Sequence, residues 1–109
     1  IDNLENHLKI KNGGFDIKVL PTFRPDKGMN IESEYFNEWV DKLEKASGVE
    51  IKDLNSFLDA IRKRHDFFHS AGCRISDHGV EKVYFENFTE NEINKIFVNA
   101  RKNRQICFD

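Results

Sequence analysis

The clearest structural signal in the chain lies in residues 53–72, DLNSFLDAIRKRHDFFHSAG. Side chains of one face recur there at the three- and four-residue spacing of an α-helix. That face consists of Leu54, Phe57, Leu58, Ile61, His65 and Phe68. Asp53 before the segment is a typical N-cap, and Gly72 is a typical stop. The pattern predicts a long helix with one face buried against the rest of the fold.

Three further helices are predicted around this one. Residues 35–43 carry apolar side chains at helical spacing, between a candidate N-cap at Ser33 and a stop at Gly48. Residues 89–92, TENE, form a capping box ahead of a last apolar stripe that runs to Ala100. Near the start, residues 2–11 predict a short helix that ends at the glycine pair 13–14.

Two segments favour strands. Residues 15–20, FDIKVL, alternate between apolar and polar side chains, and Pro21 ends them. Residues 73–76, CRIS, predict a second short strand, and residues 83–85 another extended piece. Between the first strand and the helix pair, residues 21–33 lack a helical period and predict a long loop. The order of elements predicts an α/β fold with parallel strands joined through helices.

The composition is that of a globular protein. With 39% hydrophobic residues, ten of them phenylalanine, the 109-residue chain has enough apolar surface for one core. A net charge of -2 gives no electrostatic case for nucleic-acid binding. No apolar run approaches the roughly 20 residues that cross a bilayer, and the first residues do not have the pattern of a signal peptide. Cys73 and Cys107 make no disulfide framework, so a cytoplasmic protein is expected.

Each predicted strand is followed by a polar cluster. The first cluster is residues 21–26, PTFRPD, and the second is residues 76–79, SDHG. In parallel α/β folds, ligands bind beyond the carboxyl ends of the strands, where both clusters would lie. Arg24 can hold a carboxylate through two hydrogen bonds, whereas Asp77 and His78 can accept a proton, donate one or bind a metal. The two clusters together suit a polar, anionic substrate.

The two clusters also support a resemblance to a known family. Residues 19–31, VLPTFRPDKGMNI, and residues 62–79, RKRHDFFHSAGCRISDHG, resemble the central region of the uronate isomerases, also called glucuronate isomerases. This family belongs to the amidohydrolase superfamily, whose members have a distorted (β/α)₈ TIM-like barrel and usually a divalent metal, often zinc. The resemblance implies interconversion of D-glucuronate with D-fructuronate, and of D-galacturonate with D-tagaturonate, by proton transfer between C1 and C2. It implies that Arg24 binds the sugar acid and that Asp77 and His78 are catalytic.

The same resemblance predicts how the chain is organised. It implies one piece of a barrel, residues 1–109, with a helical insertion at 33–71 between a first part at 1–32 and a last part at 72–109. A complete barrel needs roughly 200 residues or more, and the chain begins with Ile1, so we expect an internal fragment that is inactive alone. The family's His-x-His metal ligands are absent here, so no metal is expected in this chain. The parent enzyme could be an oligomer.

Two other interpretations fit the residues. The first is a non-catalytic helical module that binds a partner through Tyr35, Phe36, Trp39 and Phe68. The second is a small metal-binding domain that uses His65, His69 and His78, since the first two are spaced i, i+4 as in H-E-x-x-H motifs. The residues alone also allow a surface ion pair between Arg24 and Asp26 and a simple turn at 77–79. The basic run at 62–64 predicts a solvated helix face.

Overall fold

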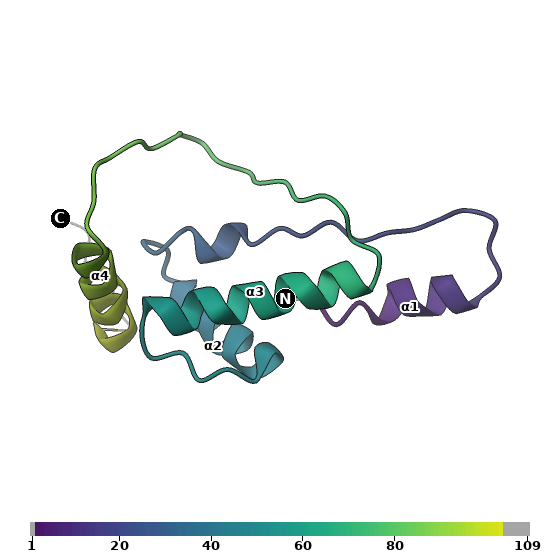
Figure 1. The fold of residues 1–109 in the computed structure, drawn as a ribbon, viewed down its shortest axis with the longest axis horizontal. Coiled ribbons are helices and arrows are strands. Elements are labelled where there is room, and N and C mark those ends of the chain that lie inside the picture. Colours follow the sequence, from purple (N-terminus) through teal and green to yellow (C-terminus); the bar gives the residue numbers. More distant parts are fainter. Residues whose placement is uncertain (1, 104–109) are drawn as a thin grey trace.

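The computed structural model describes residues 2–103 of the chain, so Cys107 lies outside the described residues. Its elements are α1 (Glu5–Asn12), the 3-10 helix η1 (Asp26–Gly28), α2 (Phe36–Ser47), α3 (Leu54–Ser70) and α4 (Glu90–Asn103). Helix α3 runs along the middle of the molecule, with α2 packed against it, α4 across one end and α1 beyond the other (Figure 1). All four predicted α-helices are therefore formed.

The ends of α3 follow from local hydrogen bonds. Asp53 Oδ1 accepts from the backbone N–H of Ser56 at 2.8 Å, and Ser56 Oγ accepts from the N–H of Asp53 at 3.0 Å. This reciprocal pair satisfies two N–H groups that the first turn of a helix leaves open. At the other end the chain turns through Gly72, whose φ of 104° disfavours residues with a side chain. Both boundaries are where the sequence predicts them.

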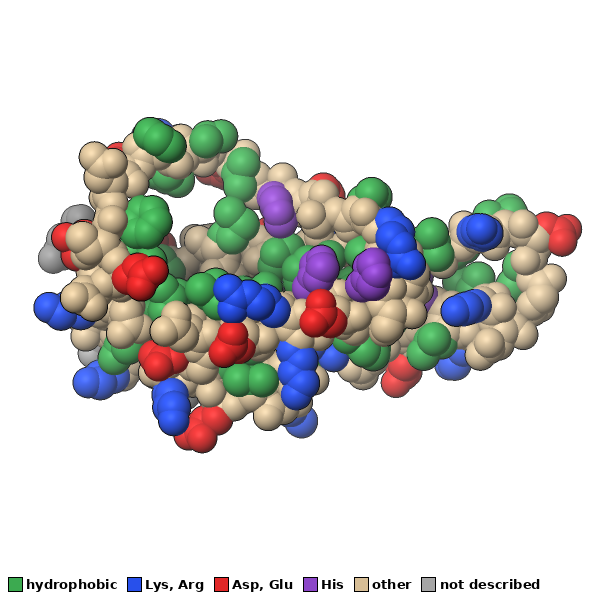
Figure 2. Space-filling model, viewed as in Figure 1, with side chains coloured by type: hydrophobic (Ala, Val, Ile, Leu, Met, Phe, Trp, Pro, Cys, Tyr) green, Lys and Arg blue, Asp and Glu red, His purple; other side chains and the backbone are tan. Residues whose placement is uncertain are grey.

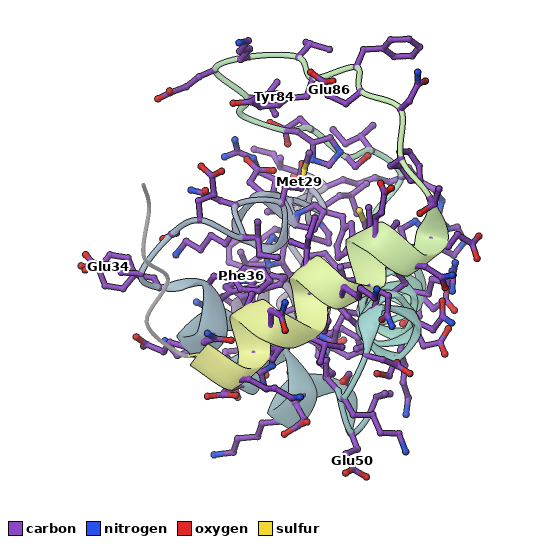
Figure 3. The ribbon with its side chains drawn as sticks, turned by 90° about the vertical axis from the view of Figure 1, so that its left-hand side faces the viewer. Met29, Glu34, Phe36, Glu50, Tyr84 and Glu86 are labelled. Atoms are coloured by element: carbon purple, nitrogen blue, oxygen red, sulfur yellow. The ribbon has the colours of Figure 1, made fainter. Side chains whose placement is uncertain are left out.

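An aromatic core joins α2, α3 and α4. The rings of Phe57 and Phe97 lie 4.9 Å apart between centroids, and Phe36 lies 6.2 Å from each of them. All three are buried, together with Val40, Leu43, Ile51, Ala60 and Ala100. Figure 3 shows Phe36 inside the body of the molecule, beneath α4. Burial of this apolar surface is the main force that holds the three helices together.

Polar contacts fix the position of α4 on this core. Asn37 Nδ2 donates to the carbonyl of Ala100 at 2.8 Å, and Arg101 donates back to Asn37 Oδ1 at 2.9 Å. A second nitrogen of Arg101 pairs with Asp41 at 2.8 Å. The apolar core supplies the attraction, and these directional contacts select one orientation of α4 against α2.

A smaller core anchors the N-terminal segment to α3. Leu4, Phe68 and Cys73 are buried together there. Arg62 and Lys63 are exposed, as predicted for the solvated face at 62–64, but Arg64 is only 9% exposed, so the prediction is wrong for this residue. Its guanidinium donates to the carbonyl of Asp2 at 2.6 Å and lies 4.3 Å from the centre of the Phe67 ring. The arginine is buried because it ties the chain ahead of α1 to the side of α3.

The predicted strands do not form. Within residues 2–103 the only β-type pairing is one isolated parallel bridge between Phe23 and Ser76. A strand needs a neighbour to accept its hydrogen bonds and to cover its apolar side chains. Residues 15–20 and 83–85 have no such neighbour, and their large apolar side chains are exposed. The α/β prediction is therefore wrong in its strands for the described residues, although the single bridge has the parallel direction that it required.

The molecule is elongated, with extents of 52 × 29 × 23 Å. Its radius of gyration is 16.1 Å, compared with about 13 Å for a compact domain of 100 residues. The loop between α3 and α4 stands away from the helices and carries Tyr84 and Glu86 (Figure 3). Hydrophobic side chains lie uncovered along this loop (Figure 2). Among residues 2–103, none of the helices combines the length and hydropathy that crossing a membrane requires.

Replacing a buried phenylalanine should destabilise the fold far more than replacing an exposed one. Phe97 is 2% exposed and Phe85 is 98% exposed. Phe97→Ala should lower the free energy of unfolding by about 3 to 5 kcal/mol, because it leaves a cavity between α3 and α4. Phe85→Ala is the matched control and should change it by less than about 0.5 kcal/mol. Urea unfolding followed by circular dichroism measures both, and equal effects would contradict the core described here.

Candidate active site

The two polar clusters meet above α3. The N–H of Phe23 donates to the carbonyl of Ile75 at 3.2 Å, next to the parallel bridge between Phe23 and Ser76. The Phe23 ring packs edge-on against Phe68, with 5.2 Å between centroids, and against His65 at 5.5 Å. These contacts hold residues 23 and 76 side by side. The residues that follow each of them therefore lie next to one another.

A connected set of polar side chains results. Arg24 Nε pairs with Asp77 Oδ2 at 3.2 Å, and Arg24 Nη2 pairs with Asp26 Oδ2 at 3.4 Å. Asp26 Oδ1 lies 3.2 Å from Nδ1 of His78, and Asp26 Oδ2 accepts from the N–H of Gly79 at 2.8 Å. The structure thus brings Arg24, Asp77 and His78, the three predicted site residues, into one cluster.

Asp26 is the member of this cluster that the sequence did not single out as a site residue. It lies inside the PTFRPD motif, where the residues suggest only a surface ion pair with Arg24. In the structure it contacts three of the other four residues of the cluster. Its side chain is 26% exposed, whereas those of Arg24, Asp77 and His78 are 41% to 60% exposed. The only sequence signal was its place beside Pro25 in the motif.

The surroundings of Asp26 lower the pKa of its carboxyl group. The N–H of Gly79 is the largest cause, and the His78 imidazole and the Arg24 guanidinium act in the same direction. Each of them favours the ionised carboxylate over the protonated acid. Asp26 is therefore a carboxylate, and a hydrogen-bond acceptor only, throughout the neutral pH range.

The cluster can bind an anion and move a proton. Arg24 uses Nε and one terminal nitrogen for Asp77 and Asp26, and its Nη1 makes no hydrogen bond or ion pair to the described residues. A guanidinium with one free edge can still accept a carboxylate ligand. Asp77 and His78 supply two acid–base groups beside it. Arg24 also lines a pocket of about 200 Å³, together with the rest of the 22–25 segment, Trp39 and Ile61.

The structure does not assemble the metal site of the alternative interpretation. His65 faces Asp66, and His69 faces Arg74, whereas His78 faces Asp26. Across residues 2–103 no three histidine, cysteine, aspartate or glutamate side chains are grouped so that they could hold a metal ion. The residues described here therefore do not fit a divalent metal by themselves.

The structure also does not favour the helical interaction module. Phe36 and Phe68 are buried in the two cores, and Trp39 packs against Phe57 with 6.5 Å between ring centroids. Of the four aromatic residues proposed to contact a partner, Tyr35 alone is largely exposed. These side chains hold the helices together and do not form a common surface.

The structure thus places one arginine, two aspartates and a histidine together on two parallel-bridged segments. Comparison with known proteins identifies the family of the chain. The glucuronate isomerase family model matches residues 1–108, and the chain belongs to this family. The resemblance inferred from the PTFRPD and SDHG motifs is thereby confirmed.

Individual relatives and a solved structure point to the same family. The uronate isomerase of Caldanaerobacter subterraneus subsp. tengcongensis is 52% identical over 98 residues, which are 89% of this chain and 21% of the relative. The uronate isomerase of Bacteroides thetaiotaomicron is 50% identical over 98 residues, with the same shares. The crystal structure of uronate isomerase from Thermotoga maritima superposes with a TM-score of 0.83 at 32% identity, over 97% of this chain and 24% of that one. The chain spans about a fifth of the length of the curated relatives it matches.

Because folding lowers the pKa of Asp26, the stability that its contacts provide depends on pH. Because folding lowers this pKa from the ordinary value of 3.8, the stabilisation from the carboxylate is complete above that value. It is lost as the pH falls through the lower pKa of the folded chain. Carbon-13 NMR of the aspartate carboxyl groups should show Asp26 titrating below 3.8, with the Gly79 amide signal changing at the same pH.

Two variants test this assignment. Asp26→Asn should remove the acid-dependent change of the Gly79 amide, because no ionisable group is left beside it. Asp59→Asn, which alters an exposed carboxylate paired with Arg62 on α3, should leave that change intact. A Gly79 amide that still titrates in Asp26→Asn would show that another group controls it.

Proposed function

We propose that this chain supplies part of the active site of a uronate isomerase. The observation that carries the proposal is the ion pair between Arg24 and Asp77, with His78 joined to the same cluster through Asp26. In a chain of the glucuronate isomerase family, these residues are a carboxylate-binding group beside two acid–base groups. The proposed substrates are the small sugar acids D-glucuronate and D-galacturonate, which are converted to D-fructuronate and D-tagaturonate.

The three residues have separate proposed roles. Arg24 binds the carboxylate of the sugar acid through its free edge, which fixes the distance from that carboxylate to C1 and C2. Asp77 or His78 then takes the proton from C2 and returns it to C1, while the hydroxyl proton moves from O2 to O1. Such an aldose–ketose isomerisation needs a base that becomes an acid within one turnover, and a carboxylate or an imidazole can act in both ways. Arg24 is thus the substrate-binding residue, and Asp77 and His78 are the catalytic residues.

The proposed setting is a (β/α)₈ barrel in the cytoplasm. The parallel bridge at Phe23 and Ser76 supports two neighbouring barrel strands, with residues 33–71 inserted between the parts at 1–32 and 72–109. The exposed apolar side chains of residues 15–20 support a neighbour that covers them in the assembled barrel. The family's divalent metal would be held by residues beyond those described here, and no step assigned to this chain depends on it.

A chimera tests this proposal. The 98 aligned residues of the Caldanaerobacter relative would be replaced by the corresponding residues of this chain, and D-glucuronate isomerisation would be measured. The folded chimera should be active. Arg24→Lys should raise the KM by about tenfold or more, because lysine cannot make the paired hydrogen bonds of a guanidinium.

The control is Arg62→Lys, which alters an exposed arginine that pairs with Asp59 and should leave both kinetic constants unchanged. Asp77→Asn and His78→Gln identify the base, because loss of the base should abolish exchange of the C2 proton with D₂O. A chimera that folds, as judged by circular dichroism and thermal unfolding, but has no isomerase activity would contradict the proposal. So would an active chimera that is indifferent to Arg24→Lys.

A further inference from the structure

The two carboxylate oxygens of Asp26 have different hydrogen-bond partners. Oδ1 lies 3.2 Å from Nδ1 of His78, and Oδ2 accepts from the N–H of Gly79 at 2.8 Å. Arg24 Nη2 approaches the same Oδ2 at 3.4 Å. Both oxygens are therefore used, one for the imidazole and one for the backbone that carries it. This arrangement fixes the position of the imidazole ring and the direction in which it points.

The backbone around Asp26 is itself held on the helical core. Asp26 begins η1, where the N–H of Gly28 donates to the carbonyl of Pro25 at 2.9 Å and the N–H of Met29 donates to that of Asp26 at 3.0 Å. Gly28 lies so close to α2 that an added Cβ would be 2.8 Å from the Trp39 ring. A side chain anchored on such a packed element keeps its position better than one on a free loop.

The contact with Asp26 determines which ring nitrogen of His78 carries the proton. An ionised carboxylate only accepts hydrogen bonds, so Nδ1 must be the protonated nitrogen of a neutral imidazole that faces it. The other nitrogen, Nε2, then carries the lone pair. His78 makes no other hydrogen bond to the described residues, so Asp26 alone determines this choice in the chain.

We propose that Asp26 is a positioning residue that holds His78 as the Nδ1–H tautomer and leaves Nε2 ready to accept a proton. This inference rests on the proposed function for its catalytic meaning, but the tautomer itself can be observed without catalysis. Asp26 does not have to touch the substrate. It acts by orienting one acid–base group, as carboxylates that orient a histidine do in other sites.

The first experiment is nitrogen-15 NMR of the histidine rings in the chain itself, at a pH where the imidazoles are neutral. In the wild-type chain, the His78 spectrum should show a protonated Nδ1 and an unprotonated Nε2. In Asp26→Ala, the Nε2–H tautomer should become the major form, as in free histidine. Asp66→Ala is the matched control, because it removes the carboxylate beside His65 and should leave His78 unchanged.

The second experiment measures kcat and KM in the chimera. Asp26→Ala should lower kcat by about 10- to 100-fold, as loss of an orienting partner does, with KM changed by less than about threefold. The kcat–pH profile should also change shape. A merely structural role would lower the amount of folded enzyme and leave kcat per folded molecule unchanged.

The outcomes separate the two proposals. A wild-type His78 that carries its proton on Nε2 overturns the positioning role whatever the variants do, so a variant that fails to fold cannot obscure the answer. An unchanged kcat in an active Asp26→Ala chimera overturns it as well. An inactive chimera together with an Nδ1–H tautomer in the wild-type chain contradicts the proposed function. The inference that Asp26 holds His78 as this tautomer would still be supported.

Discussion

The packing of one ring, Phe23, determines the geometry of the candidate site. Its edge-on contact with Phe68 places the segment before η1 on the surface of α3, and its N–H donates to the carbonyl of Ile75. Phe23 packs on His65 and Phe68 of α3, and its neighbour Arg24 pairs with Asp77, which follows the bridged residue of the other segment. An apolar contact thus orients a charged one.

The helices form the platform on which this arrangement rests. The aromatic core joins α2, α3 and α4, and Gly28 brings η1 into close contact with Trp39. Arg64 adds a buried connection from α3 to the chain ahead of α1. Interiors packed in this way resist small displacements. The exposed ion pairs of the cluster contribute little to stability, so their geometry depends on the helices beneath them.

Prediction from the sequence succeeded where the signals were local. The cap at Asp53 and the stops at Gly48 and Gly72 lie within a few residues of the helix ends they define. The prediction of strands was wrong because a strand needs a second segment to pair with. Within residues 2–103 only Phe23 and Ser76 form such a pair. The meeting of Arg24, Asp77 and His78 was predictable from the parallel order of the two segments. The importance of Asp26 was not, because it depends on contacts with residues more than 50 positions away.

The separation of 53 residues between Asp26 and Gly79 also has a kinetic consequence. Contacts between distant residues form only after the entropy of closing the intervening loop has been lost. Here that loop is mostly α2 and α3, which are adjacent in the chain and pack on each other. Once these two helices have packed, a large part of the loop is already compact, so the two segments meet at a smaller entropic cost. We therefore expect the transition state for folding to contain the packed pair α2 and α3, with the polar cluster forming after it.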